Sequence, residues 1–209
     1  MFRKLSQIFV SYLICTCAIA GVYEDFFKAL ELDDSRTMST LLLRGFDPNT
    51  PDPKGQVPLF VALRQGSERA AKLLMDHPEL KVDAANASGE TPVMMAALRG
   101  RADAVRALLD KGAALNREGW SPLHYAATGP EVGIVRLLLD RGAMIDARSP
   151  NGTTPLMMAA QYGNPDSAVL LLERRADPRA RNQVGWGAAD FARAAGREAL
   201  ASRLEAAAR

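Results

Sequence analysis

The apolar residues of this chain follow a pattern that returns about every 33 residues. Four short apolar segments start at prolines that lie 34, 30 and 33 residues apart: Pro58, Pro92, Pro122 and Pro155. A Thr or Ser precedes three of these prolines, and such a residue caps a helix whose first position suits proline. In three segments a glycine follows eight residues after the proline: Gly66, Gly100 and Gly163. The pattern predicts a short helix in each segment.

A second apolar feature follows each of these segments. It is a pair of leucines: Leu73-Leu74, Leu108-Leu109, Leu138-Leu139 and Leu171-Leu172. We expect a second helix around each pair, closed by Gly112 or Gly142, with Arg175 in the same place in the next repeat. Turn glycines then precede the next proline segment: Gly55, Gly89, Gly119, Gly152 and Gly185. The predicted unit is helix, turn, helix and finger loop.

The proline segments carry one phrase, with His124 in the version Ser121-Pro122-Leu123-His124. With a period near 33 residues, this phrase resembles the T-P-L-H-x-A motif of the ankyrin-repeat family. The resemblance implies an all-α ankyrin-repeat solenoid of about six repeats, with degenerate polar caps at its ends. The expected repeats lie near residues 22–50, 56–89, 90–119, 120–152, 153–185 and 186–209, in one domain over 21–209.

The first twenty residues have the features of an export signal. Arg3 and Lys4 precede a mostly apolar run, which is too short to span a bilayer comfortably. Ala18-Ile19-Ala20 is an A-x-A site, so we expect cleavage after Ala20. An uncleaved N-terminal anchor is the alternative. A lipoprotein is disfavoured, because neither cysteine follows the small residue that a lipobox requires.

Composition adds to the prediction of export. Both cysteines, Cys15 and Cys17, lie in the predicted signal, so the mature chain would have no thiol, which suits an oxidising compartment. Loss of the signal leaves 24 basic and 24 acidic residues, which gives no support for nucleic-acid binding. Abundant Arg and Ala indicate a GC-rich, bacterial source. We therefore expect a periplasmic or secreted bacterial protein that is free of the membrane after cleavage.

The sequence gives little indication of catalysis. The mature chain has only two histidines, His77 and His124, and it contains no P-loop, H-E-x-x-H or G-x-S-x-G motif. His124 occupies a place where ankyrin repeats use a structural histidine. We expect a monomeric protein that is not an enzyme and carries no cofactor.

The methionines offer an alternative function. Met94-Met95 and Met157-Met158 occupy matching places two repeats apart, with His124 between them. Thioether and imidazole ligands suit Cu(I), so copper handling in the periplasm is one hypothesis. The other is that Met94 and Met157 fill the core in place of the family histidine, while Met95 and Met158 face the groove.

The resemblance implies that a protein partner binds to the finger loops and the concave face of the inner helices. The candidate binding residues at these places are Met95, Arg99, Trp120, Tyr125, Met158, Gln161, Tyr162 and Trp186. Aromatic residues, Met and Arg are enriched in interface centres. We expect an accessory protein, or an inhibitor or immunity protein, for one exported enzyme or toxin. For the two tryptophans, packing of finger against helix is the alternative. The arginines between Arg174 and Arg181 fit a solvated mixed face better than an acidic partner.

Overall fold

The computed structural model describes residues 21–209, so the predicted signal and its cleavage site lie outside the described residues. The described part is all helical, without strands, and falls into two compact units, residues 21–81 and 82–209. This confirms the all-α expectation. No helix in the described range has the length and apolar character needed to cross a membrane.

The first unit contains four helices. They are a helix over residues 21–31 and the helices α2 (Ser35–Leu43), α3 (Pro58–Gln65) and α4 (Glu68–Met75). Phe26 stacks on Phe46 with ring centroids 4.1 Å apart, and both Phe26 and Leu74 are fully buried. Asp33 accepts a 2.8 Å hydrogen bond from the backbone N–H of Ala70, in the first turn of α4. Aromatic packing and one acidic cap thus hold this unit together.

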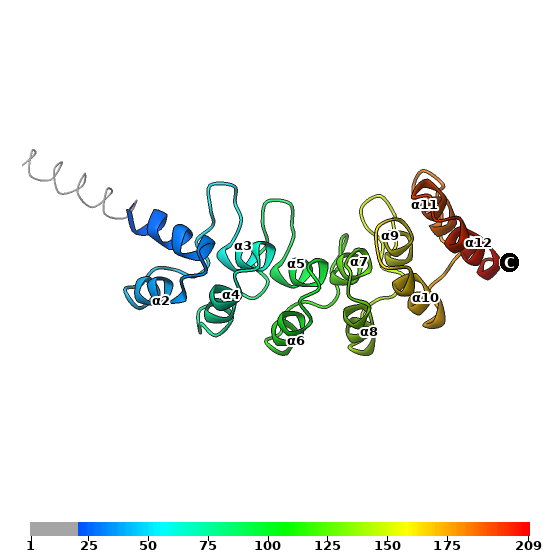
Figure 1. The fold of residues 1–209 in the computed structure, drawn as a ribbon. Helices are drawn as coiled ribbons and strands as arrows, with labels where there is room; N and C mark the ends of the chain where they lie inside the picture. Colours follow the sequence, from blue (N-terminus) through cyan, green and yellow to red (C-terminus); the bar gives the residue numbers. More distant parts are fainter. Residues whose placement is uncertain (1–20) are drawn as a thin grey trace, which may run out of the picture. The chain divides into compact units, whose positions relative to one another are not determined.

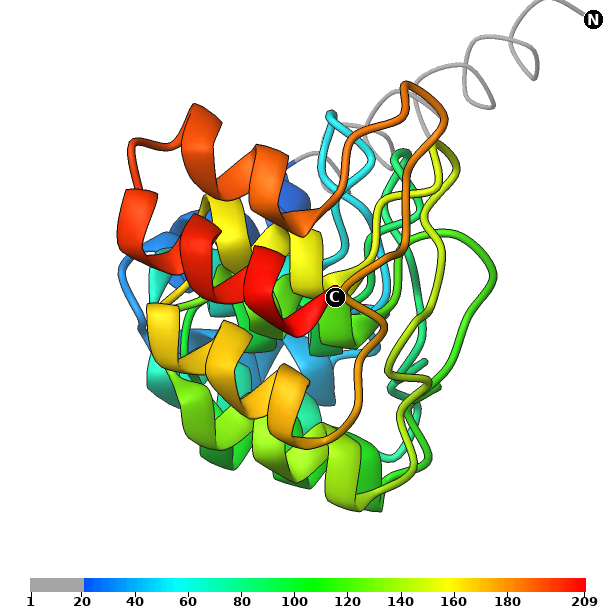
Figure 2. The same cartoon turned by 90° about the vertical axis from the view of Figure 1, so that its right-hand side faces the viewer.

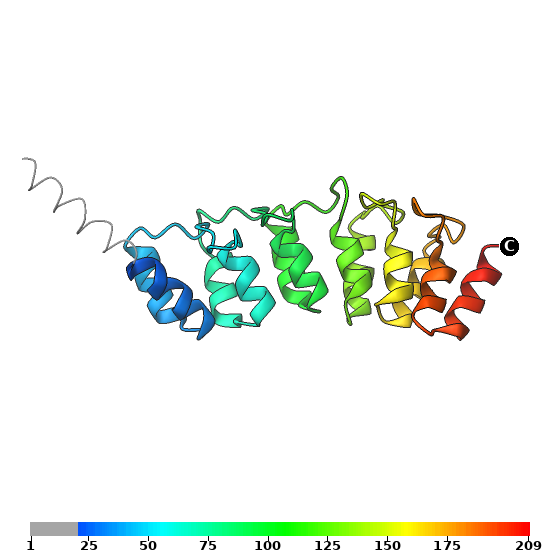
Figure 3. The same cartoon turned by 90° about the horizontal axis from the view of Figure 1, so that it is seen from above.

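The second unit contains eight helices arranged in two rows (Figure 1). The inner row consists of α5 (Pro92–Leu98), α7 (Pro122–Thr128), α9 (Pro155–Gln161) and α11 (Ala188–Ala194), each packed on the next. The outer helices are α6 (Ala102–Asp110), α8 (Val132–Asp140), α10 (Pro165–Glu173) and α12 (Glu198–Ala207). The finger loops of this unit all lie on one side of the helices (Figures 2 and 3).

Leucines and glycines have the places that the pattern predicted. Leu108, Leu138 and Leu171 of the outer helices are fully buried. The five finger glycines have φ between 74° and 81°, where side chains with a Cβ are strained. Arg175 adopts φ 69° after α10, at the place where Gly112 follows α6 and Gly142 follows α8.

Adjacent repeats are also joined by a recurring hydrogen bond. An Asp or Asn side chain at the start of one loop accepts the backbone N–H of a residue about 30 positions later. In the second unit the side chains of Asp83, Asn116 and Asp146 accept the backbone N–H groups of Ala114, Met144 and Asp177, respectively, at 2.8–3.0 Å. Asn49 and Lys81 make the same contact in the first unit, at 2.8 Å.

Candidate functional site

Helix α7 is at the centre of the candidate site, and its first turn is fixed by Ser121 and His124. The N-cap Ser121 and the first helical residue Pro122 set the start of the helix, as expected. The backbone N–H of Ser121 donates to Nδ1 of His124 at 3.1 Å. The other ring nitrogen, Nε2, lies 3.0 Å from the carbonyl oxygen of Thr153 and donates to it. His124 therefore links its own repeat to the next finger.

His124 is fully buried, and burial lowers the pKa of its imidazole, although hydrogen bonds to Thr153 and Ala147 oppose the shift. The ring is neutral at pH 7, and both of its nitrogens are engaged by protein groups. A general base needs a nitrogen within reach of a substrate proton, and His124 has none to offer. Its geometry is that of a structural histidine.

Tyr125, the next residue of α7, is held by the preceding finger. Its hydroxyl donates to Oε1 of Glu90 at 2.9 Å, and Oε2 of Glu90 accepts from the side-chain amide of Asn86 at 2.7 Å. Burial raises the pKa of Tyr125, and the hydrogen bond to Glu90 raises it further. The phenol therefore remains a neutral donor, and its ring has one fixed orientation.

A small apolar pocket lies beside Tyr125, entirely within the second unit. Its volume is about 200 Å³, and its lining residues are Leu98, Trp120, His124, Tyr125, Thr128 and Met158. The Trp120 ring meets His124 and Tyr125 edge to face, with centroids 5.2 and 6.5 Å apart. Sites for small molecules have volumes of roughly 300–1,000 Å³. This pocket is smaller, and its size suits a single apolar side chain.

The structure brings three of the candidate binding residues together in this pocket: Trp120, Tyr125 and Met158, all partly buried. Tyr162, at the end of α9, is 58% exposed, and its neighbour Gln161 is partly buried. These positions form an accessible surface on the inner row of helices.

Three further candidates lie outside the pocket. Arg99, at the end of α5, is exposed. Trp186 is 44% exposed and packs edge to face on Phe191. Met95 does not present the surface that we expected, because it is only 6% exposed. An apolar thioether packs more favourably in the interior than in water, and Met95 is therefore better described as part of the core.

Some residues of this surface were not predicted from the sequence. Thr128 and His124 line the pocket, although neither was among the candidate binding residues. Phe191 was also missed, yet the register pointed to it. It follows Trp186 by five residues, as Tyr125 follows Trp120, and both pairs pack edge to face.

Two of the four methionines of the copper hypothesis have a structural role. Met94 and Met157 are buried, and their sulfur atoms accept the backbone N–H groups of Thr91 and Thr154, both at 3.4 Å. This is the bond that His124 makes with Ser121 in its own repeat. The described residues contain no cluster of His, Cys, Asp and Glu that could hold a metal ion. The geometry favours packing and capping over metal binding.

The arginines near the last finger are engaged by neighbouring groups. Arg174 pairs with Asp140 at 2.7 Å, and Arg179 donates to the carbonyl oxygens of Ala208 and Arg209 at 2.7 and 2.8 Å. These contacts support the interpretation of a solvated mixed face.

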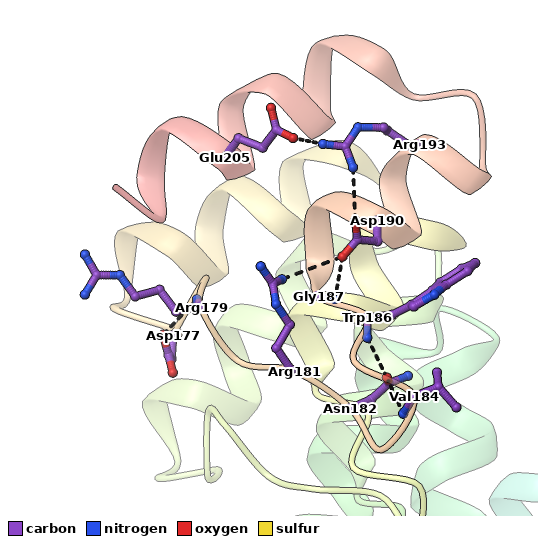
Figure 4. Close-up of polar contacts among 10 residues, drawn as sticks. All are labelled: Asp177, Arg179, Arg181, Asn182, Val184, Trp186, Gly187, Asp190, Arg193 and Glu205. Atoms are coloured by element: carbon purple, nitrogen blue, oxygen red, sulfur yellow. Dashed lines mark hydrogen bonds and ion pairs between the residues drawn. The ribbon is translucent and has the colours of Figure 1, made fainter.

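The α11–α12 pair carries a polar network at the end of the second unit (Figure 4). Asp190 accepts the backbone N–H of Gly187 at 2.8 Å and pairs with Arg193 at 3.0 Å and Arg181 at 3.7 Å. Arg193 also pairs with Glu205 of α12. Asp190 occupies the register position of His124. The last repeat therefore has a partly exposed carboxylate at the place where the preceding repeats have a buried side chain.

Comparison with known proteins is consistent with this architecture. A family model described as "Ankyrin repeats (3 copies)" matches residues 26–118 and 111–182. The rat Ankyrin repeat and SAM domain-containing protein 6 is 33% identical over 144 residues, which are 69% of this chain and 13% of the relative. The human Transient receptor potential cation channel subfamily A member 1 is 29% identical over 85 residues, which are 41% of this chain and 8% of the relative. The chain therefore spans only a small part of these relatives.

Proposed function

The chain belongs to the ankyrin-repeat family, and we propose that it binds one protein partner through the inner-helix face of residues 82–209. Ankyrin repeats form solenoids that act as protein interaction modules, and the family model that matches the chain is of this kind. The proposed function is that of a non-enzymatic binding protein, which is monomeric without its partner. The pocket beside Trp120 is the proposed main contact with that partner.

The observation that carries the proposal is the pocket of about 200 Å³ with rigid aromatic walls. Glu90 and Asn86 hold Tyr125, and Trp120 packs on two rings, so the walls need little ordering when a partner binds. Preorganisation of this kind increases affinity, because less conformational entropy is lost. Aromatic residues around a desolvated pocket are typical of interface hot spots.

We also propose that the protein is exported and acts in the periplasm, as an accessory or immunity protein for an exported enzyme or toxin. The support is the N-terminal segment, with Arg3 and Lys4 before an apolar run and Ala18-Ile19-Ala20 after it. N-terminal sequencing of the protein from fractionated cells tests this. We expect Gly21 as the first residue, and a retained Met1 in the membrane fraction would contradict export.

The binding proposal is tested with a partner recovered on the immobilised protein and then purified. Replacing Trp120 and Tyr162 together by alanine should weaken binding by about 2 kcal/mol, the usual threshold for a hot spot. Calorimetry measures the affinity, and a thermal melt of each variant checks the fold. Met144→Ser is a matched control, because the Met144 side chain is 61% exposed and belongs neither to the pocket nor to an inner helix. If the double variant binds with unchanged affinity, the interface lies on another surface.

A further inference from the structure

The tip of the last finger exposes an apolar side chain at a place where the other fingers are polar. The residue just before the turn glycine is Lys54, Ser88, Glu118 or Asn151 in the earlier fingers and Val184 in the last. Val184 is 75% exposed. A single exposed valine is common on protein surfaces, so Val184 matters here only together with exposed apolar side chains beside it.

Hydrogen bonds hold this finger tip in one conformation. Oδ1 of Asn182 accepts the backbone N–H groups of Val184 at 3.1 Å and Trp186 at 2.9 Å. The tip is also joined to the preceding finger. Gln183 donates its backbone N–H to the carbonyl of Asn151 at 3.0 Å and its side-chain amide to that of Pro150 at 2.8 Å. The two finger tips thus form one connected surface.

The apolar surface of this tip extends toward the inner helices. In Figure 4, Val184 and Trp186 extend to the same side of the finger, and Arg181 extends to the other. Trp186 is 44% exposed and packs on Phe191 of α11. Val184, Trp186 and Phe191 therefore offer a partner a short apolar strip.

The charges carried by the two fingers are positive. Between Ala147 and Pro165 the only charged residue is Arg148, and between Pro178 and Ala189 the charged residues are Arg179 and Arg181. Arg181 pairs with Asp190 of α11 at 3.7 Å, so Arg148 is the charge that matters most for a partner. Arg148 is exposed, and its guanidinium donates to the carbonyl oxygens of Gly152 and Arg181 at 3.1 and 2.7 Å. Carbonyls leave its charge uncompensated. That charge acts over roughly 8–10 Å in physiological salt.

We propose that the joined tips of the last two fingers dock a protein segment in which an apolar side chain is flanked by carboxylates. The apolar side chain contacts Val184 and Trp186, and the carboxylates face Arg148. A nucleic acid would use the arginines, but it would gain little from an exposed valine. The inference rests on the proposed function, since both require a protein partner, and it adds the chemistry of that partner.

The test is selection of a random peptide library, displayed on phage, against the full chain immobilised at low salt. We expect the selected peptides to combine an aromatic or aliphatic residue with flanking Asp or Glu. A synthetic peptide of the selected sequence should bind Val184→Ser about tenfold more weakly, because this change gives the last finger the serine that the second finger has at this place. Arg148→Gln should flatten the salt dependence of binding, and Arg148→Lys should restore it. Met144→Ser should bind like the wild type.

The outcomes separate the two proposals. If the selected peptides are acidic and lose binding with Val184→Ser, the inference holds. If Trp120→Ala abolishes binding of the purified partner and Val184→Ser changes neither partner nor peptide binding, the pocket remains the interface and the inference is wrong. Selection of basic or uncharged peptides would also overturn it. So would an oligonucleotide that binds the wild type and Val184→Ser equally, because that result would indicate an arginine patch alone.

Discussion

Helices α7 and α11 occupy the same place in their repeats, but they meet different surroundings. His124 of α7 is fully buried and reaches the next finger through Thr153. Asp190 of α11 is partly exposed and pairs with Arg181 and Arg193. Both side chains accept the backbone N–H three residues earlier. The hydrogen bond that caps the helix is thus present in both repeats. The side chain is an uncharged imidazole where protein surrounds it in α7, and a carboxylate where solvent reaches it in α11.

The largest effect is expected from removing the polar end altogether. Truncation before Trp186 deletes α11 and α12 and exposes the apolar residues of α9, among them the buried Met157 and Ala160. Each repeat depends on its neighbours, so the shortened protein should aggregate or melt at a much lower temperature. Light scattering and a thermal melt measure this. A monomer with unchanged melting would mean that α11 and α12 are not the cap.

Exchange of the two side chains tests the comparison directly. His124→Asp places a carboxylate without a cationic partner in the interior and should lower the free energy of unfolding by about 3–5 kcal/mol. The reverse change, Asp190→His, alters half-exposed ion pairs and should cost less than about 1 kcal/mol. Urea denaturation compares the two variants. Equal losses would show that position in the stack does not decide which residue is tolerated.

A smaller effect is expected at Arg197, which ties the end pair to the rest of the unit. Its guanidinium donates to the carbonyl oxygens of Ala159, Ala160 and Gly163 at the end of α9, at 3.2, 3.4 and 2.7 Å. Arg197→Met keeps much of the aliphatic stem and removes these bonds, so stability should fall by about 1.5–3 kcal/mol. Hydrogen exchange should show faster opening in α11 and α12 than in α7. Uniform opening would argue against a local role.

The smallest effect is a dependence on pH. Because burial lowers the pKa of His124 in the folded state, the unfolded chain takes up the proton more readily. Stability is therefore retained above about pH 6.5 and lost as the pH falls below it, by at most about 1.4 kcal/mol per pH unit. His124→Met, which copies Met157, should remove this part of the slope. Identical slopes between pH 5 and about 6.5 would contradict the neutral, buried histidine.

Much of the fold follows from local signals in the sequence. Prolines mark the starts of α3, α5, α7 and α9, and the buried leucines mark the outer helices, because caps and apolar spacing act within a few residues. Arg175 was expected at the place of Gly112 and Gly142, and it adopts the left-handed conformation that those glycines also have.

The candidate site was less predictable, because it depends on contacts between repeats. The pocket combines Leu98 of α5, Trp120 of a finger and Met158 of α9, and their approach is fixed by helix packing. The burial of Met95 and the partial exposure of Met158, at the same register position, likewise depend on neighbours. Phe191 could have been found from the register alone, since its pairing with Trp186 repeats that of Tyr125 with Trp120.

The recurring hydrogen bond between successive repeats has a mechanical consequence. In the second unit, Asp83, Asn116 and Asp146 each hold a backbone N–H of the next repeat, and the paired residues lie 28 to 31 positions apart. Each of these hydrogen bonds joins only neighbouring repeats, so a tensile load on the unit passes through the three bonds one after another. Under force applied at its ends, this unit should therefore lengthen in steps, one released repeat at a time, and it would behave as an extensible spring.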